Sequence, residues 1–156
     1  MIISDTGPLI VLFKTELLFL LKEIYHEVLI PEAVANELTE KEEGTLLLKE
    51  NQWIKVKKVN ENRILLVLKS ILGSGEAEAI ALAIETNSPL LIDERKGRII
   101  AGDAGIKIRG TLGVFVEAKE EGLIKSVNMC IKRLKKAGYY LDSELIDIVL
   151  RKCGEL

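Results

Sequence analysis

The chain begins with Met1-Ile2-Ile3-Ser4-Asp5-Thr6-Gly7-Pro8, the stretch around which the rest of the sequence is organised. Ile2 and Ile3 show no polar alternation, which is typical of a short strand buried on both faces of a parallel sheet. Asp5 then lies at the carboxyl end of that strand, where open α/β sheets bind ligands. In this segment taken alone, an N-cap for the following helix is the more common role for Asp5.

Composition and length limit the class of protein. A chain of 156 residues fits one domain with a full-sized core. The longest apolar runs, such as Leu17–Leu21 and Ile64–Leu68, are far shorter than the roughly 20 residues that span a bilayer. The N-terminus lacks a basic segment followed by a long apolar stretch, so no signal peptide is expected. We therefore expect a cytoplasmic protein that makes no membrane contact.

Charge and residue usage exclude several kinds of site. His26 is the single histidine, which excludes most zinc sites and His-based catalytic sites. Cys130 and Cys153 form no ligand-spaced cluster and are expected to be reduced, packing residues. The net charge of −2 excludes retention of nucleic acid by overall charge. A polyanionic ligand would have to be bound by local basic patches.

Strand-like and helix-like segments alternate along the chain. Short apolar runs at Val28–Ile30, Leu90–Ile92 and Ile106–Ile108 predict further strands, and the apolar–basic alternation of Trp53–Val59 predicts an edge strand. Helices are expected at Leu9–Phe13, Leu17–Lys22, Pro31–Thr39, Lys41–Glu50, Asn60–Leu72, Glu76–Ile84, Glu94–Ala101, Val114–Glu120, Ile124–Lys136 and Asp142–Lys152.

This alternation predicts a three-layer α/β/α fold with a central parallel sheet. The last two helices are expected to form a C-terminal helical hairpin beyond the last strand. We interpret residues 1–156 as a single domain, with a core over residues 1–123 and a helical extension over residues 124–156.

Four acidic residues could converge at one edge of this sheet. Asp93 ends a second apolar strand as Asp5 ends the first, and neighbouring strands are only about 5 Å apart. Glu37 and Glu76 lie on helices that could face the same edge. Carboxylates brought together repel one another unless a cation is present or some are protonated. Oxygen ligands without His or Cys favour Mg²⁺ or Mn²⁺, which activate water in metal-dependent nucleases.

Each of these acids also has an ordinary structural interpretation. Glu76 could be a first-turn acid favoured by the helix dipole, and Glu37 could be a solvated helix residue. Glu78 lies about 200° around the helix from Glu76, so the two cannot point the same way. The pattern as a whole is more specific than its members, because two strand-end aspartates accompany acids on the helices between them.

The sequence also resembles a known family. The run Ile3–Ile10 resembles the opening of PIN-domain proteins, and Ile30–Leu38 resembles their second-helix segment. Gly75–Ala83, Leu91–Arg98 and Gly110–Val114 are similar to a PIN-like branch related to the toxin ribonucleases of VapBC toxin–antitoxin modules. The resemblance spans about residues 2–125.

The resemblance implies an activity and partners. The family's acidic quartet corresponds to Asp5, Glu37, Glu76 and Asp93, which would be both metal ligands and catalytic residues of a Mg²⁺- or Mn²⁺-dependent ribonuclease. Such a protein could be the toxin of a toxin–antitoxin module, a homodimer silenced by a cognate antitoxin. The apolar first helices and the C-terminal hairpin are the expected contact surfaces.

Four further residues are assigned to RNA binding. Lys96 and Arg98, directly after Asp93, would contact the RNA backbone, although ordinary surface solvation is an alternative for each. Thr6 and Thr111 would orient a metal-bound water or a phosphate, on the strength of the resemblance.

Alternatives remain open at this stage. Glu94 could be the family's acidic residue in place of Asp93. Glu78 could likewise take the place of Glu76. A PIN-like scaffold without catalysis, serving as a binding or regulatory protein, is the second functional interpretation. A response-regulator-like phosphoryl-transfer domain is the third, and the single acid at the end of the first strand, Asp5, argues against it.

Overall fold

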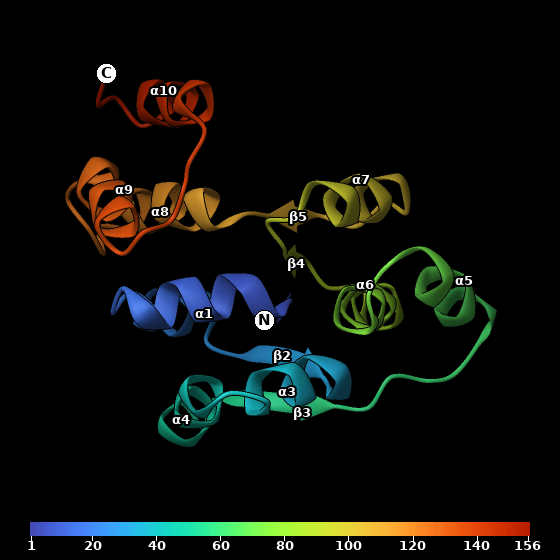
Figure 1. Ribbon diagram of the computed structural model, residues 1–156. Helices are drawn as coiled ribbons and strands as arrows, with labels where there is room; N and C mark the ends of the chain where they lie inside the picture. Colours follow the sequence, from blue (N-terminus) through green and yellow to red (C-terminus); the bar gives the residue numbers. More distant parts are fainter.

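The computed structural model describes residues 1–156, and its centre is one sheet of five parallel strands in the order β3-β2-β1-β4-β5 (Figure 1). The strands are β1 (Ile2–Ser4), β2 (Val28–Pro31), β3 (Ile54–Lys57), β4 (Leu90–Leu91) and β5 (Ile108–Arg109). The alternating strand–helix pattern is thereby confirmed. The run that alternates apolar and basic residues forms β3, which lies at an edge of the sheet as predicted.

The central strand shows why the fold has three layers. Ile2 and Ile3 are both fully buried, but they belong to two different apolar clusters on opposite faces of the sheet. Successive side chains of a strand point to opposite faces, so an apolar pair can be buried in this way only when helices cover both sides.

Ten helices form the outer layers. They are α1 (Thr6–Lys14), α2 (Phe19–Tyr25), α3 (Glu32–Thr39), α4 (Glu42–Glu50), α5 (Arg63–Ile71), α6 (Ser74–Thr86), α7 (Arg95–Asp103), α8 (Thr111–Glu120), α9 (Val127–Lys136) and α10 (Ser143–Lys152). Helices α5, α6 and α7 bury residues in the smaller cluster, and the other seven contribute to the larger one. Figure 1 shows α5, α6 and α7 on one side of the strands and α1, α4, α8 and α9 on the other.

Some boundaries differ from the sequence-based expectations. Helix α6 begins at Ser74 and not at Glu76, because the carbonyl of Gly73 already accepts the first helical hydrogen bond, at 2.9 Å. Helix α8 likewise begins at Thr111, before the predicted start. Pro31 is the extended residue that caps α3, with ψ 165°, and not its first helical residue.

The C-terminal hairpin of α9 and α10 packs on α8 and shares its core. Glu155 fastens the end of the chain to the start of α9. Its carboxylate accepts hydrogen bonds from the backbone N–H groups of Val127 and Asn128 and from Lys119 Nζ. Burial acts to raise the pKa of Glu155, but these donors outweigh it and lower the pKa to about 2.

The apolar residues of the first two helices are mostly core residues. Leu9, Leu12, Leu20 and Leu21 are fully buried, and among the large apolar side chains of these helices Phe19 is half exposed. None of the ten helices combines the length and the apolar character that crossing a membrane requires.

Candidate active site

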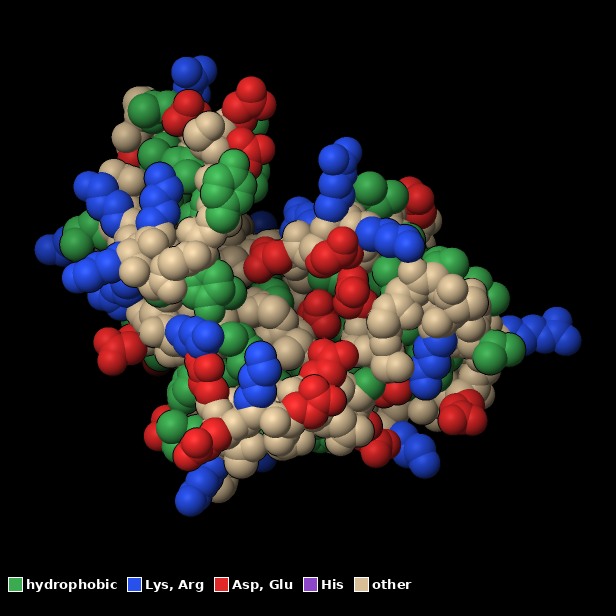
Figure 2. Space-filling view, viewed as in Figure 1, with side chains coloured by type: hydrophobic (Ala, Val, Ile, Leu, Met, Phe, Trp, Pro, Cys, Tyr) green, Lys and Arg blue, Asp and Glu red, His purple; other side chains and the backbone are tan.

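Two of the four acidic residues predicted at the sheet edge follow neighbouring strands. Ser4 of β1 pairs with Leu91 of β4, so that Asp5 and Asp93 follow strands that lie side by side. The backbone N–H of Asp5 donates to the carbonyl of Leu91 at 3.0 Å, which extends the pairing to the first acid. Figure 2 shows a band of acidic side chains through the hollow at the middle of this face, with lysines and arginines around it.

Asp5 occupies the N-cap position of α1, but its side chain makes no capping hydrogen bond. The residue is 8% exposed. Burial raises its pKa to about 6, against the smaller lowering effect of the Thr6 N–H, and the charges of Glu37, Asp93 and Glu94 raise it further. The carboxylate therefore faces other acids, which the simple capping interpretation does not explain.

Glu37 reaches the same place from α3. Its Oε2 accepts a hydrogen bond from Thr6 Oγ1 at 2.5 Å, so the threonine after the first strand holds the second acid. The carboxylate lies directly against Gly75 at the start of α6. A Cβ at that position would come within 2.7 Å of both Cδ and Oε2 of Glu37. Residue 75 must be glycine for the two helices to bring this carboxylate to the sheet edge.

Glu76 contributes the buried oxygen of the group. Its Oε2 has no hydrogen-bond partner although it is shielded from solvent. Burial raises the pKa of Glu76 to about 7, and a hydrogen bond with Glu94 and the charges of Asp5, Glu94 and Glu37 act in the same direction. Near neutral pH this side chain is therefore close to the midpoint of its titration.

Glu78 serves a different purpose from Glu76. Its Oε1 accepts a hydrogen bond from the Ala33 N–H at 3.1 Å, in the first turn of α3, and its Oε2 pairs with Lys69 at 3.4 Å. The side chain thus joins α6 to α3 and α5, away from the acidic centre. This location follows from the angular separation of the two glutamates on the helix.

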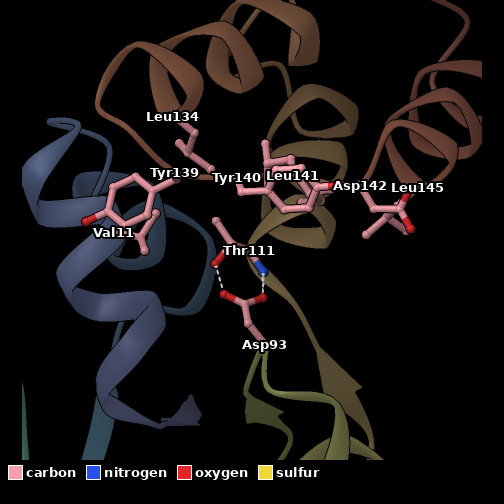
Figure 3. Close-up of a pocket in the computed structure, with 10 residues that line it drawn as sticks. Val11, Asp93, Thr111, Leu134, Tyr139, Tyr140, Leu141, Asp142 and Leu145 are labelled. Carbon is pink, nitrogen blue, oxygen red and sulfur yellow. Dashed lines mark hydrogen bonds between the residues drawn. The ribbon is translucent and has the colours of Figure 1, made fainter.

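Asp93 is held by Thr111, the first residue of α8. The Thr111 N–H and Oγ1 donate to the two carboxylate oxygens of Asp93 at 2.7 and 2.5 Å, as Figure 3 shows. Glu94 is the N-cap of α7 and accepts from the Gly97 N–H at 2.9 Å. This hydrogen bond lowers the pKa of Glu94. Asp93 and Glu94, the two alternative ligands considered from the sequence, therefore both lie at the acidic centre. Glu94 is also a neighbour of Glu76.

Three of the basic residues near the site are engaged within the protein. Arg98 Nη1 donates to the carbonyl of Ile92 at 2.8 Å, so the side chain supports the end of β4. Arg109 pairs with Glu117 at 3.4 Å. Lys96 is exposed. On the other side of the centre, Lys14 and Lys41 line a pocket of about 510 Å³ with Thr6 and Glu37, and Lys14 pairs there with Glu43 at 3.4 Å.

The two lysines of this pocket and Gly75 were not identified from the sequence. Lys14 and Lys41 come together only because α1 packs on α4. Gly75 does carry a signal, since glycine inside the first turn of a helix is otherwise unfavourable. That signal indicates close packing but does not name the residue that packs there.

The donor set fits a hard divalent cation. The acids offer only oxygen ligands, and the unpartnered oxygen of Glu76 lacks the counter-charge that a cation would supply. As the side chains stand, no three of them are placed to enclose an ion. Glu37 and Asp93 instead accept hydrogen bonds from Thr6 and Thr111. Mg²⁺ commonly binds through only one or two carboxylates and keeps several waters.

The family comparison agrees with this fold and its acidic sheet edge. The model of a PIN-domain family matches residues 1–155. Searches of curated proteins and of solved structures gave no match. PIN domains are typically nucleases, which generally use divalent metal ions. With its five-stranded parallel sheet and a match over nearly its whole length, this chain belongs to the PIN-domain family.

Proposed function

We propose that this chain is a Mg²⁺- or Mn²⁺-dependent endoribonuclease whose metal ligands and catalytic residues are Asp5, Glu37, Glu76 and Asp93. The observation that supports it most is the meeting of four carboxylates from four separate segments, among them one buried oxygen without a partner. Bringing carboxylates together in a fold is unfavourable unless a bound cation compensates them or some of them are protonated.

Each residue has a role that its contacts suggest. The ion, when bound to these carboxylates, would lower the pKa of a coordinated water and neutralise charge on the phosphate. Asp5 and Glu76 have raised pKa values, so an ion competes with protons for them as pH falls. Thr6 and Thr111 hold Glu37 and Asp93 in place through their hydroxyl groups.

The RNA backbone would be held by basic side chains around the acidic hollow. Lys96 lies beside the acids, and Lys14 and Lys41 line the pocket next to Glu37. Arg98, by contrast, acts through the end of β4, because its guanidinium is bonded to the backbone there. Local lysines allow a chain with net charge −2 to bind a polyanion.

A catalytically inactive PIN-like binding protein is the second candidate, and one observation favours it. No three acidic side chains are positioned to enclose an ion. On this alternative Glu37 and Asp93 keep their hydrogen bonds with Thr6 and Thr111, and the protein acts by binding a partner.

Cleavage of single-stranded RNA separates the two candidates. Purified protein is incubated with a mixed-sequence RNA, with Mn²⁺ or with EDTA, beside Asp5→Asn and Asp93→Asn variants. Glu78→Gln is the matched control, because this acid lies on the same helix as Glu76 but outside the acidic centre. Cleavage that requires Mn²⁺, persists in Glu78→Gln and disappears in both asparagine variants supports the ribonuclease.

Two results would contradict the ribonuclease. Equal cleavage by the wild type and both asparagine variants would identify a contaminating nuclease. Calorimetric titration with Mn²⁺ provides a second readout. Tight, Asp5-dependent binding of the ion without cleavage of any RNA supports the inactive alternative.

We further propose that the protein is the toxin of a toxin–antitoxin module and acts as a homodimer. Exposed apolar side chains on α10, Leu145 and Ile148, offer a contact surface on the C-terminal hairpin. The first helices offer less, since Phe19 is their main exposed apolar residue. Growth arrest on expression, abolished by Asp5→Asn, tests the toxin. A monomeric mass by sedimentation would remove the dimer.

A further inference from the structure

A pocket of about 280 Å³ adjoins the acidic centre on the side of the C-terminal hairpin (Figure 3). Asp93 and its partner Thr111 form its floor, so the pocket and the acidic centre share a wall. The other walls come from α1, from the start of α8, from α9 and α10, and from the segment that joins these two helices. Their residues are Val11, Leu112, Leu134, Tyr139, Tyr140, Leu141, Asp142 and Leu145.

The hairpin builds this pocket through the way in which α9 ends. Gly138 has a φ of +96°, and its N–H donates to the carbonyl of Lys135 at 3.0 Å. The N–H of Tyr139 donates to the carbonyl of Leu134 at 3.1 Å. This pair of hydrogen bonds is a Schellman motif, which brings the residue after the glycine against the last helical turn. Tyr139 and Leu134 accordingly both line the pocket.

Tyr140 has no structural role within the chain that accounts for it. Its side chain is 90% exposed, although an aromatic ring of this size usually covers apolar surface. It lies at the pocket beside Leu141 and Asp142. A tyrosine presented to solvent next to an apolar recess offers a flat face on which a planar ligand can stack.

The charges of the lining indicate which part of a nucleotide can enter. The pocket contains no Lys, Arg or His, and its charged members are Asp93 and Asp142. A phosphate would be repelled by these two carboxylates. A nucleobase is uncharged and flat, and its amino groups can donate to carboxylate oxygens. The pocket is thus suited to a base whose own phosphate group lies towards the acidic centre.

We propose that this pocket is a base-binding subsite, in which Tyr140 stacks on the unstacked base of the nucleotide next to the scissile phosphate. The inference rests on the proposed ribonuclease function, since it needs single-stranded RNA at the acidic centre. The pocket volume of about 280 Å³ is small for a ligand pocket. A space of this size suits one base better than a helix of a partner protein.

Binding measurements with altered rings and altered bases test the subsite. A fluorescently labelled single-stranded RNA is bound in Ca²⁺ buffer, where a gel confirms that it stays intact. Stacking on an aromatic side chain is worth about 1–3 kcal/mol per base. Tyr140→Ala should therefore bind the RNA between about 5-fold and about 150-fold more weakly. Tyr140→Phe should bind as the wild type does, because it keeps the ring.

A series of RNAs with one abasic nucleotide each locates the base. At one position the abasic change should weaken binding to the wild type but not to Tyr140→Ala, because the stacking partner is already absent. Phe19→Ala is the matched control, because it removes an exposed ring outside the pocket. This variant should bind the RNA with wild-type affinity. Tyr140 is itself almost fully exposed, so its replacement should leave the fold intact.

The outcomes separate failure of the subsite from failure of the ribonuclease. The subsite is overturned if Tyr140→Ala binds RNA as tightly as the wild type, or if an abasic nucleotide weakens binding to Tyr140→Ala as much as to the wild type. Mn²⁺-dependent cleavage would still support the enzyme in either case. Coupling between Tyr140 and one base, without cleavage, supports the subsite and overturns the enzyme. Absence of any RNA binding overturns both. A wild-type dimer that Tyr140→Ala dissociates would identify a second copy of the chain as the occupant.

Discussion

Replacing Gly75 by alanine should remove activity while leaving the fold intact. The new Cβ would stand 2.4 Å from Oε1 of Glu37 and 2.7 Å from its Cδ and Oε2, whereas ordinary contact begins at 3.4 Å. The carboxylate must therefore move by about 1 Å. It can do so because it is the end of a flexible side chain, but the movement takes it away from Thr6 Oγ1.

The substitution should change stability little and activity strongly. Alanine in a helix is favoured over glycine by roughly 0.5–1 kcal/mol, which offsets the cost of moving the side chain. We expect the free energy of unfolding to change by less than about 1 kcal/mol. Misplacement of a catalytic group by about 1 Å can cost about 100-fold in rate. We therefore expect a loss of cleavage rate between about 10-fold and about 100-fold.

The assay compares Gly75→Ala with Gly102→Ala. Gly102 lies in α7, and a Cβ there would meet nothing within 4 Å. Both variants gain the same methyl group on a helix, but only the buried Gly75 places it against Glu37. Unfolding in urea gives the stability, and initial rates of Mn²⁺-dependent RNA cleavage give the activity. Full activity in Gly75→Ala would refute the placement of Glu37 in the catalytic group.

Three further predictions follow from the contacts of single carboxylates. Glu76→Gln should abolish Mn²⁺-dependent cleavage, whereas Glu78→Gln should leave the rate within about twofold of wild type, since its amide oxygen can still accept the helix N–H. Asp5 has a pKa of about 6 in the fold against 3.8 for an unperturbed group, so its ionisation destabilises the metal-free protein as pH rises through this interval. Asp5→Asn should therefore raise the unfolding free energy at pH 8 by up to about 3 kcal/mol, and urea titrations at pH 4 and pH 8 should show this difference disappearing at the lower pH. Glu155, with its pKa lowered to about 2, stabilises the fold above pH 4.5 and loses this contribution as pH falls towards 2. Glu155→Gln should lower the melting temperature at pH 7 by several degrees, measured by calorimetry. An unchanged melting temperature would show that the hydrogen bonds of Glu155 at the start of α9 do not stabilise the fold.

The raised pKa values of Asp5 and Glu76 have a common origin. Both are shielded from water and both face other acids, so each favours the protonated form. Groups of this kind bind a cation in competition with protons. The affinity for Mn²⁺ should consequently fall as pH decreases below about 7, and the number of protons released on binding reports how many protons the ion displaces from the acids.

The sequence alone determined the architecture and the positions of the acids along the chain. Ile2 and Ile3 predicted a strand buried on both faces, and Asp5 and Asp93 followed the two strands that became neighbours. Local patterns suffice here because a strand between two layers must be apolar on both faces. The boundaries of α6 and α8 were less accurate, since Gly-rich turns allow a helix to begin at any of several residues.

Only the tertiary structure decided which acids meet and what surrounds them. The choice between Glu76 and Glu78 depended on where α3 packs against α6, because Glu78 is bonded to the first turn of α3. The pocket beside Asp93 depended on the hairpin, which brings Tyr139 and Tyr140 to the sheet edge from the far end of the chain. Such proximity arises from packing between distant segments, and no local sequence pattern encodes the distance between them.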